Sequence, residues 1–190
     1  PVISSAASDV YKRQNKDIAN EMQKFYDDWW EDASKEFKYS YIDILPNITN
    51  TITAHDVQVN SITAWDQSVI RKGIPYELGK FNVNFKKSGE YKITLRRWPK
   101  ESNLNLRDSI DDFIPAKKYW DQQSSGKSMN IASAFIKIGN KEYKVDLSDN
   151  LKTASINIDI SSGKTSLEPG FILDNGQTSI AFYTDIDFLY

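Results

Sequence analysis

Residues 81–97 read FNVNFKKSGEYKITLRR, and their alternation decides the fold class. Apolar side chains stand at every second position on either side of Ser88-Gly89-Glu90, and they are Phe81, Val83, Phe85, Tyr91, Ile93 and Leu95. A period of two indicates strands with one buried face. A turn this short between two such strands predicts a β-hairpin.

Arg97 closes this stretch on the apolar side, because alternation places it on the face of Tyr91, Ile93 and Leu95. An inward arginine must be paired, or must face an anion or an interface. A buried structural ion pair and a functional contact are both open at this point.

Further alternating segments follow towards the C-terminus. Residues 131–147 predict a second hairpin around Gly139-Asn140, and residues 156–160 predict a strand that turns at 161–163 and returns through 164–173. A last strand is expected after Asp174-Asn175-Gly176, and a first one begins near residue 38. Successive short turns predict an antiparallel sheet or sandwich. Residues 98–130 interrupt this rhythm and predict a long loop insertion.

Residues 15–37 have a helical period instead. One stripe recurs at steps of three or four and consists of Ile18, Met22, Phe25, Trp29, Ala33 and Phe37. A helix with so many aromatic side chains needs a partner surface. We therefore expect an α+β fold in which this N-terminal helix packs on the β-rich part, residues 38–190.

Composition excludes several functions. The 190 residues carry a net charge of −2, so no basic field favours nucleic acid, and no apolar run reaches membrane-spanning length. Cysteine is absent and His55 is the single histidine, which excludes thiolate metal sites and sites with several histidine ligands.

The first fourteen residues are set apart from the fold. Ser4 to Gln14 reads SSAASDVYKRQ, which resembles the translation of an adapter oligonucleotide from a sequencing library, as in metagenomic data. We expect the natural sequence to start near Asn15.

Two strings imitate a phosphate loop, SGKS at 125–128 and SGKT at 162–165. The motif needs another glycine five residues before its second glycine, and Asp121 and Ile158 occupy those positions. Both strings are therefore rejected as nucleotide sites.

Polar groups at two loops could carry chemistry. His55 beside Asp56 could act as an acid, a base or an anion contact, or it could only hydrogen-bond a loop. Trp65, Gln67 and Arg71 could offer a ring, a donor and a cation to a sulfate or sugar, or could be ordinary packing.

Several strings, in order, resemble the C-terminal subdomain of arylsulfatase-type, formylglycine-dependent sulfatases. They are FYDDWW at 25–30, TAHD at 53–56, WDQ at 65–67 with Ile70-Arg71 and Gly73, LRRWP at 95–99, AFIKIG at 134–139 and the closing region 171–183. The family often has Trp-Phe where this chain has Gly170-Phe171.

The resemblance implies that residues 15–37 link this piece to a missing N-terminal catalytic domain. The parent would be a periplasmic or secreted sulfuric ester hydrolase, with formylglycine and calcium as cofactors and a sulfated carbohydrate or aryl sulfate as substrate. No C/S-x-P-x-R motif occurs here, so this chain alone is expected to be inactive, with no cofactor of its own. Its expected auxiliary substrate contacts are His55, Asp56, Trp65, Gln67, Arg71, Arg97 and Trp98.

A rival hypothesis is a stand-alone carbohydrate-binding β-sandwich module, with Trp65, Trp98 or Trp120 as stacking platforms. A plain interaction domain is a third possibility. Neither the helix nor the strands alone decide among them.

Overall fold

The computed structural model describes residues 15–35, 40–57, 66–114 and 123–190. The chain divides into two units, Pro1–Ser40 and Tyr41–Tyr190, and each is described by itself. Trp65, Trp120 and the adapter-like residues 1–14 lie outside the described residues.

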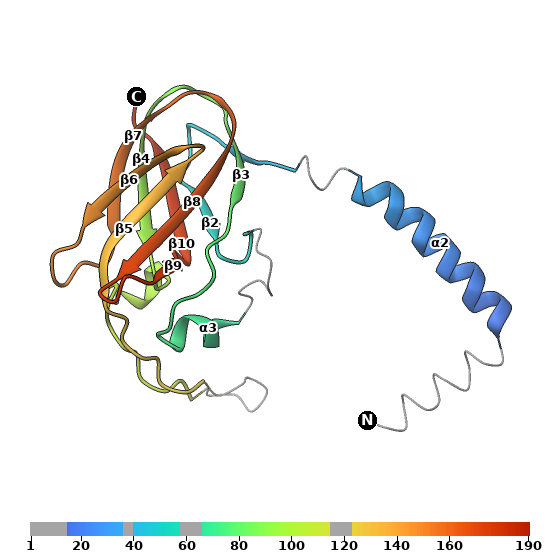
Figure 1. The fold of residues 1–190 in the computed structure, drawn as a ribbon, viewed down its shortest axis with the longest axis horizontal. Helices are drawn as coiled ribbons and strands as arrows, with labels where there is room; N and C mark the ends of the chain where they lie inside the picture. Colours follow the sequence, from blue (N-terminus) through green and yellow to red (C-terminus); the bar gives the residue numbers. More distant parts are fainter. Residues whose placement is uncertain (1–14, 36–39, 58–65, 115–122) are drawn as a thin grey trace. The chain divides into compact units, whose positions relative to one another are not determined.

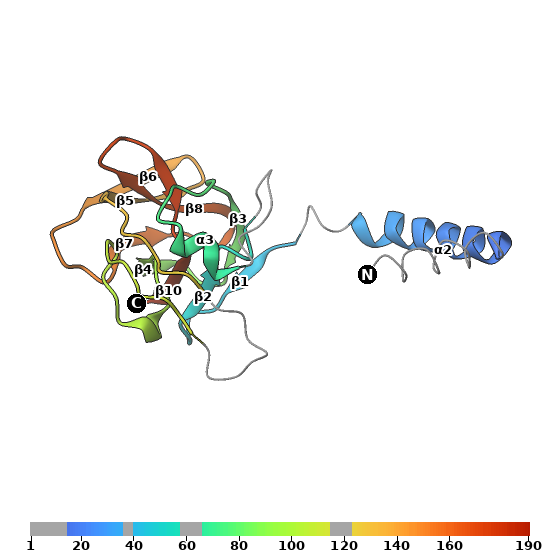
Figure 2. The ribbon, with the colours of Figure 1, turned by 90° about the horizontal axis from the view of Figure 1, so that it is seen from below.

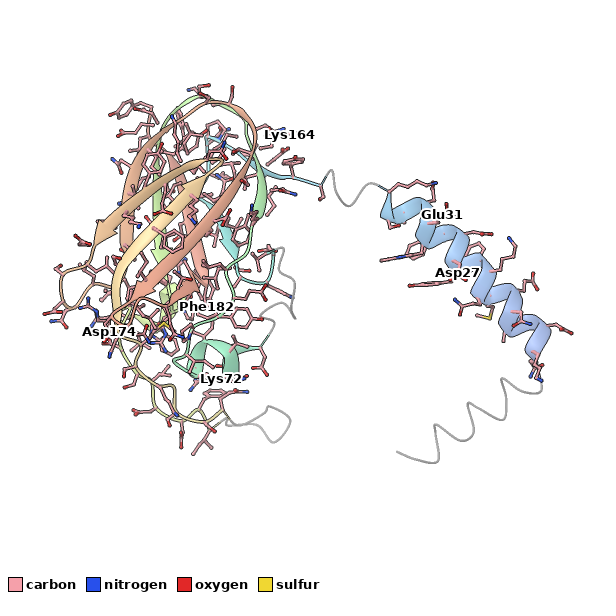
Figure 3. The ribbon with its side chains drawn as sticks, in the orientation of Figure 1. Asp27, Glu31, Lys72, Lys164, Asp174 and Phe182 are labelled. Atoms are coloured by element: carbon pink, nitrogen blue, oxygen red, sulfur yellow. The ribbon has the colours of Figure 1, made fainter. Side chains whose placement is uncertain are left out.

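Helix α2 spans Lys16–Ser34 and confirms the predicted helix (Figure 1). Its surface is reinforced by i, i+4 contacts, among them Lys24 Nζ to Asp28 Oδ2 at 2.8 Å. The apolar stripe is exposed on the helix, as Phe25 and Trp29 illustrate at 74% and 52%. Figure 3 marks Asp27 and Glu31 on the same helix. That this helix packs on the β-rich unit stays a prediction.

The β-rich unit is a sandwich of two sheets, seen as two layers in Figures 1 and 2. The larger sheet has the order β1-β3-β8-β5-β6, with β9 also paired to β8. Its strands are β1 Ile42–Ile44, β3 Phe81–Phe85, β5 Ile131–Ile138, β6 Lys141–Asp146, β8 Gly163–Leu173 and β9 Thr178–Ile180. The smaller sheet has the order β2-β10-β4-β7, from β2 Asn50–Thr53, β4 Gly89–Arg96, β7 Ala154–Ile160 and β10 Tyr183–Phe188.

Among the described strands, all pairings but one are antiparallel, which confirms a mainly antiparallel α+β fold. The exception is β1, which runs parallel to β3 with Ile42 opposite Val83. Inward side chains of both sheets form one core, for example Phe171 from the larger sheet and Ile93 from the smaller. The short helix α3, Gln67–Arg71, packs Val69 and Ile70 against that core.

The predicted hairpin at 81–95 is wrong, although both strands exist. β3 pairs with β1 and β8, whereas β4 pairs with β10 and β7, so the chain crosses from one sheet to the other at the turn. Gly89 sits at this crossing with φ +152°, and a Cβ there would clash with the backbone oxygen of Tyr190. The turn therefore joins the two layers.

The C-terminal segments behave in the same way. β7 and β8 follow each other but lie in different sheets, and the predicted last strand is divided into β9 and β10, one in each sheet. The hairpin at 131–147 is confirmed, since β5 pairs antiparallel with β6. Gly139 has φ +54° at its turn, a conformation that suits glycine.

Residues 98–130, predicted as a loop insertion, contain a short 3₁₀ turn, Lys100–Ser102, and are otherwise irregular where described. They are nevertheless tied to the fold, because Trp98, Leu106 and Met129 are at most 5% exposed. Two isolated antiparallel bridges, Ile110 with Gly126 and Phe113 with Gln123, fold the segment back on itself.

Candidate functional site

The candidate site lies at the end of the sandwich that carries α3 (Figure 1). Asp66 caps this helix, since its Oδ1 accepts a hydrogen bond from the backbone N–H of Ser68 at 2.8 Å. Gly73, with φ +64°, ends it. Its Cβ would lie 2.8 Å from Cβ of Lys127, so only glycine lets the two segments approach this closely.

Arg97 lies inside the protein, fully buried, as its inward position predicted. Its Nη1 donates to the carbonyl oxygen of Asp108 at 3.1 Å, and its Nη2 donates to the carbonyls of Ile70, at 3.1 Å, and Lys127. Burial lowers the pKa of Arg97 to about 10, with an opposing effect from the Asp108 carboxylate, so the guanidinium stays charged at neutral pH. Arg97 thus fastens β4 to α3 and to two loops.

Trp98 packs next to Arg97, whose guanidinium carbon lies 4.4 Å from the centre of its ring. The indole is 5% exposed, and its Nε1 has no hydrogen-bond partner among the described residues. This geometry matches a cation–π contact in the core rather than an open stacking platform. A role for Trp98 or Arg97 in touching substrate stays a prediction.

Arg71 is also largely buried, at 9% exposure. Its Nε donates to Oε1 of Gln67 at 3.0 Å, one helical turn earlier. Its Nη1 donates to the carbonyls of Asp111 and Ser124, at 3.1 and 2.9 Å. The structure therefore joins two of the predicted residues directly, and Gln67 orients the Arg71 guanidinium.

The neighbouring residues His55 and Asp56 have separate environments. Asp56 Oδ2 accepts hydrogen bonds from the N–H of Thr53, at 3.0 Å, and from its hydroxyl, at 2.9 Å. The carboxylate thereby shapes the turn after β2. His55 is exposed, and its backbone N–H donates to the Thr53 hydroxyl at 3.3 Å.

His55 and Gln67 line one pocket of about 210 Å³, the His55 pocket. The remaining lining residues are Thr53, Ala54, Asp66, Ile70, Phe182 and the start of β10. Tyr183 comes from that start, where it lies opposite Thr53 in the strand register. Burial is the main cause that raises the pKa of the Tyr183 hydroxyl. Neither Asp66 nor Tyr183 is among the predicted site residues. Tyr183 could not be predicted, because strand pairing brings it to the His55 pocket over a long sequence separation.

A larger pocket of about 460 Å³, the Arg71 pocket, shares no lining residue with the His55 pocket. Its lining residues are Ser68, Arg71, Lys72, Ile74, Gln123, Ser124, Ser125 and Lys127. Lys72, the residue that follows α3, is marked in Figure 3. The only sequence signal for Lys127 was the SGKS string, which had been rejected as a phosphate loop and indeed lies in no strand-to-helix turn.

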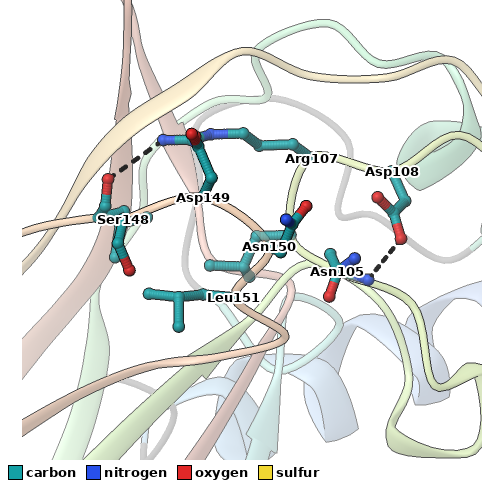
Figure 4. Close-up of a pocket in the computed structure, with 9 residues that line it drawn as sticks. Asn105, Arg107, Asp108, Ser148, Asp149, Asn150 and Leu151 are labelled. Atoms are coloured by element: carbon teal, nitrogen blue, oxygen red, sulfur yellow. Dashed lines mark hydrogen bonds and ion pairs between the residues drawn. The ribbon is translucent and has the colours of Figure 1, made fainter.

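A third hollow, shown in Figure 4, lies between residues 105–108 and 147–151. Arg107 crosses it and donates to Oδ1 of Asp149 at 2.6 Å and to the carbonyl oxygen of Ile131 at 2.7 Å. Asp108 accepts a hydrogen bond from the N–H of Asn105 at 2.8 Å. These groups hold the loops to each other.

Within the described ranges, no three His, Cys, Asp or Glu side chains gather in a way that could hold a metal ion. In that same part of the chain, no helix is long and apolar enough to cross a membrane.

No family model matches this chain, and no curated protein matches it either. Among solved structures, the chain is similar to the crystal structure of a ruminal GH26 endo-β-1,4-mannanase, with a TM-score of 0.37 and 12% sequence identity. The match covers 80% of this chain and 27% of the mannanase chain.

Proposed function

We propose that this chain is the C-terminal subdomain of an arylsulfatase-type sulfuric ester hydrolase, where it supports the catalytic domain and lines part of the substrate pocket. The observation that carries the proposal is the meeting of the resemblance-bearing segments around α3. The TAHD segment, α3 itself and the RRW segment come from distant parts of the sequence. Arg97 joins the last of these directly to the carbonyl of Ile70.

The division of labour follows from the side chains present. Arg97 and Arg71 donate their described hydrogen bonds to backbone carbonyls and to Gln67, so they hold loops in place. His55 is exposed in its pocket and is the residue best placed to meet a substrate. The chain has no C/S-x-P-x-R motif and its described part has no cluster of carboxylates, so these residues do not fit formylglycine or calcium. We assign both to the upstream catalytic domain.

The first experiment reads the source DNA upstream of the Asn15 codon. We expect an in-frame C/S-x-P-x-R motif, and the complete reading frame should release 4-nitrophenol from 4-nitrophenyl sulfate. Replacing the motif's Cys or Ser with Ala should abolish that release. An uninterrupted upstream sequence without the motif would refute the sulfatase assignment.

In the complete enzyme, His55→Ala should raise KM or lower kcat by on the order of tenfold, as expected for one lost hydrogen bond to a charged group. Lys92→Gln, at an exposed position on β4, is the control and should keep wild-type kinetics. If His55→Ala also keeps wild-type kinetics and only lowers the melting temperature, His55 is structural.

The alternative is a stand-alone carbohydrate-binding module, which the β-sandwich architecture of residues 41–190 favours. It predicts firm binding of the chain to an insoluble polysaccharide in a pull-down, with no need of an upstream domain. Of its three candidate platforms, Trp98 is buried under Arg97, whereas Trp65 and Trp120 lie outside the described residues.

A further inference from the structure

The Arg71 pocket has a cationic and hydroxyl-rich lining. Arg71, Lys72 and Lys127 bring positive charge, and Ser124, Ser125 and Gln123 bring polar groups. None of the eight described residues that line it is acidic. For a chain whose net charge is −2, this is a local concentration of positive charge.

The pocket is held open by backbone contacts on both sides. The N–H of Lys127 donates to the carbonyl of Arg71 at 2.8 Å, and the carbonyl of Lys127 accepts from Arg97. Gly126 exchanges two hydrogen bonds with Ile110, at 3.0 and 2.7 Å. A Cβ on Gly126 would lie 2.5 Å from Cγ2 of Ile110, so the segment around Gly126 fits tightly against its neighbours. The Lys127 side chain is exposed while its backbone is fixed.

Arg71 is the buried cation at the base of this arrangement. Its Nε and Nη1 are used by Gln67 and by two carbonyls, and Nη2 has no hydrogen bond to any residue in the described ranges. Lys72 and Lys127 are exposed, and no ion pair with a described carboxylate is found for either. The two lysine ammonium groups and Nη2 of Arg71 thus have no described partner, and all three residues line the same pocket.

We propose that the Arg71 pocket binds an acidic sugar residue, one that carries a sulfate ester or a carboxylate. Guanidinium, ammonium and hydroxyl groups are the donors that oxoanions prefer. The volume of about 460 Å³ suits a sugar unit, and Ile74, 56% exposed, gives the ring an apolar wall. This site shares no lining residue with the His55 pocket and does not depend on a sulfatase parent.

The test titrates the ¹⁵N-labelled full chain with galactose 6-sulfate, galacturonate and neutral galactose, and follows the backbone amide signals by NMR. The two acidic sugars should shift the amides of Ser124, Ser125 and Lys127, and added salt should weaken them. Shifts by one acidic sugar alone would identify which oxoanion the site takes. Galactose shifting these amides as strongly, or no shift with any sugar, would overturn the proposal.

Variants separate a local site from general charge attraction. Lys72→Gln/Lys127→Gln removes two exposed charges and should weaken binding about tenfold, which corresponds to two surface charge contacts. Lys92→Gln/Lys141→Gln removes the same charge at exposed strand positions and should bind like wild type. Equal weakening by both pairs would overturn the site. The upstream-motif experiment is independent of either outcome.

Discussion

Two consecutive arginines, Arg96 at the end of β4 and Arg97 directly after it, are bound differently. Arg96 lies on the outer face of the smaller sheet, whereas Arg97 lies in the interior. Arg96 forms a two-point ion pair with Asp185, from Nε to Oδ2 at 3.1 Å and from Nη2 to Oδ1 at 2.9 Å. Arg97 has no such carboxylate partner among the described residues and donates to three backbone carbonyls instead.

The two arginines therefore differ in structural role: Arg96 reinforces an existing contact, whereas Arg97 is a joint between separate segments. Asp185 lies on β10, which already pairs with β4 through backbone hydrogen bonds, so the Arg96 pair adds to a contact that exists without it. The carbonyls bound by Arg97 belong to Ile70, Asp108 and Lys127, in α3 and two irregular segments. Those segments have few regular links to β4, so Arg97 matters more to the fold although its charge is less well balanced.

Arg97→Met should have the largest effect. It leaves three partly buried carbonyls without their donor, and we expect the free energy of unfolding to fall by about 3 kcal/mol, which corresponds to roughly 1 kcal/mol for each lost hydrogen bond. Urea denaturation of the full chain, followed by tryptophan fluorescence, measures it.

Arg96→Met is the matched control, since it makes the same chemical change one residue earlier. An unfolding free energy that falls more for Arg96→Met than for Arg97→Met would reverse the comparison. The NMR spectrum should locate the Arg97→Met perturbation at residues 70, 108 and 127, because those carbonyls lose a partner.

A double-mutant cycle on Arg96 and Asp185 should have an intermediate effect. The side chains are 9% and 16% exposed, so the pair is partly shielded, and we expect a coupling of about 1–2 kcal/mol from Arg96→Met, Asp185→Asn and the double variant. Thr51 still donates its hydroxyl to Asp185 at 2.8 Å, which limits the loss. A coupling near zero would mean that backbone pairing alone positions these strands.

Most of the strands could be predicted from the sequence, but the sheet to which each belongs could not. Alternation shows which side chains face inwards, and in a sandwich the inner face of both sheets has the same pattern. Phe85 and Tyr91 both point into one core, their ring centres 5.0 Å apart, yet they lie in opposite sheets. A short turn is equally able to join neighbours within a sheet or to cross between sheets.

The inward position of Arg97 was predictable for the same reason, whereas its partners were not. Every residue has a backbone carbonyl, so the residue types at 70, 108 and 127 do not predict that these carbonyls bind Arg97. Lys127 is a similar case, because its place beside Arg71 depends on the close approach at Gly73 and Gly126. Gly170 is likewise explained only by the three-dimensional structure. The ring of Phe135 lies against it, and a Cβ there would lie 2.5 Å from Cζ of Phe135.

The exposed pair of Asp43 and Lys86 extends the comparison to solvent and should have the smallest effect. Lys86 Nζ lies 2.9 Å from Oδ1 of Asp43, which also accepts a hydrogen bond from Asn84 at 2.8 Å. These donors, Lys86 first, lower the pKa of the Asp43 carboxyl. Its stabilising contribution is therefore present above the unfolded-state pKa, about 3.9, and is lost as the pH falls through the lower folded-state pKa.

Lys86→Gln should lower the melting temperature slightly at neutral pH and low salt, and not at all at high salt or at a pH where Asp43 is protonated, because an exposed pair is screened by solvent and ions. Circular dichroism melts of the full chain under these conditions measure the difference. A loss that persists at high salt would show that the Lys86 side chain stabilises the edge of the sheet by packing rather than by charge. The contribution of Lys86 would then not be that of an ion pair, and it could not be compared with the Arg96 pair.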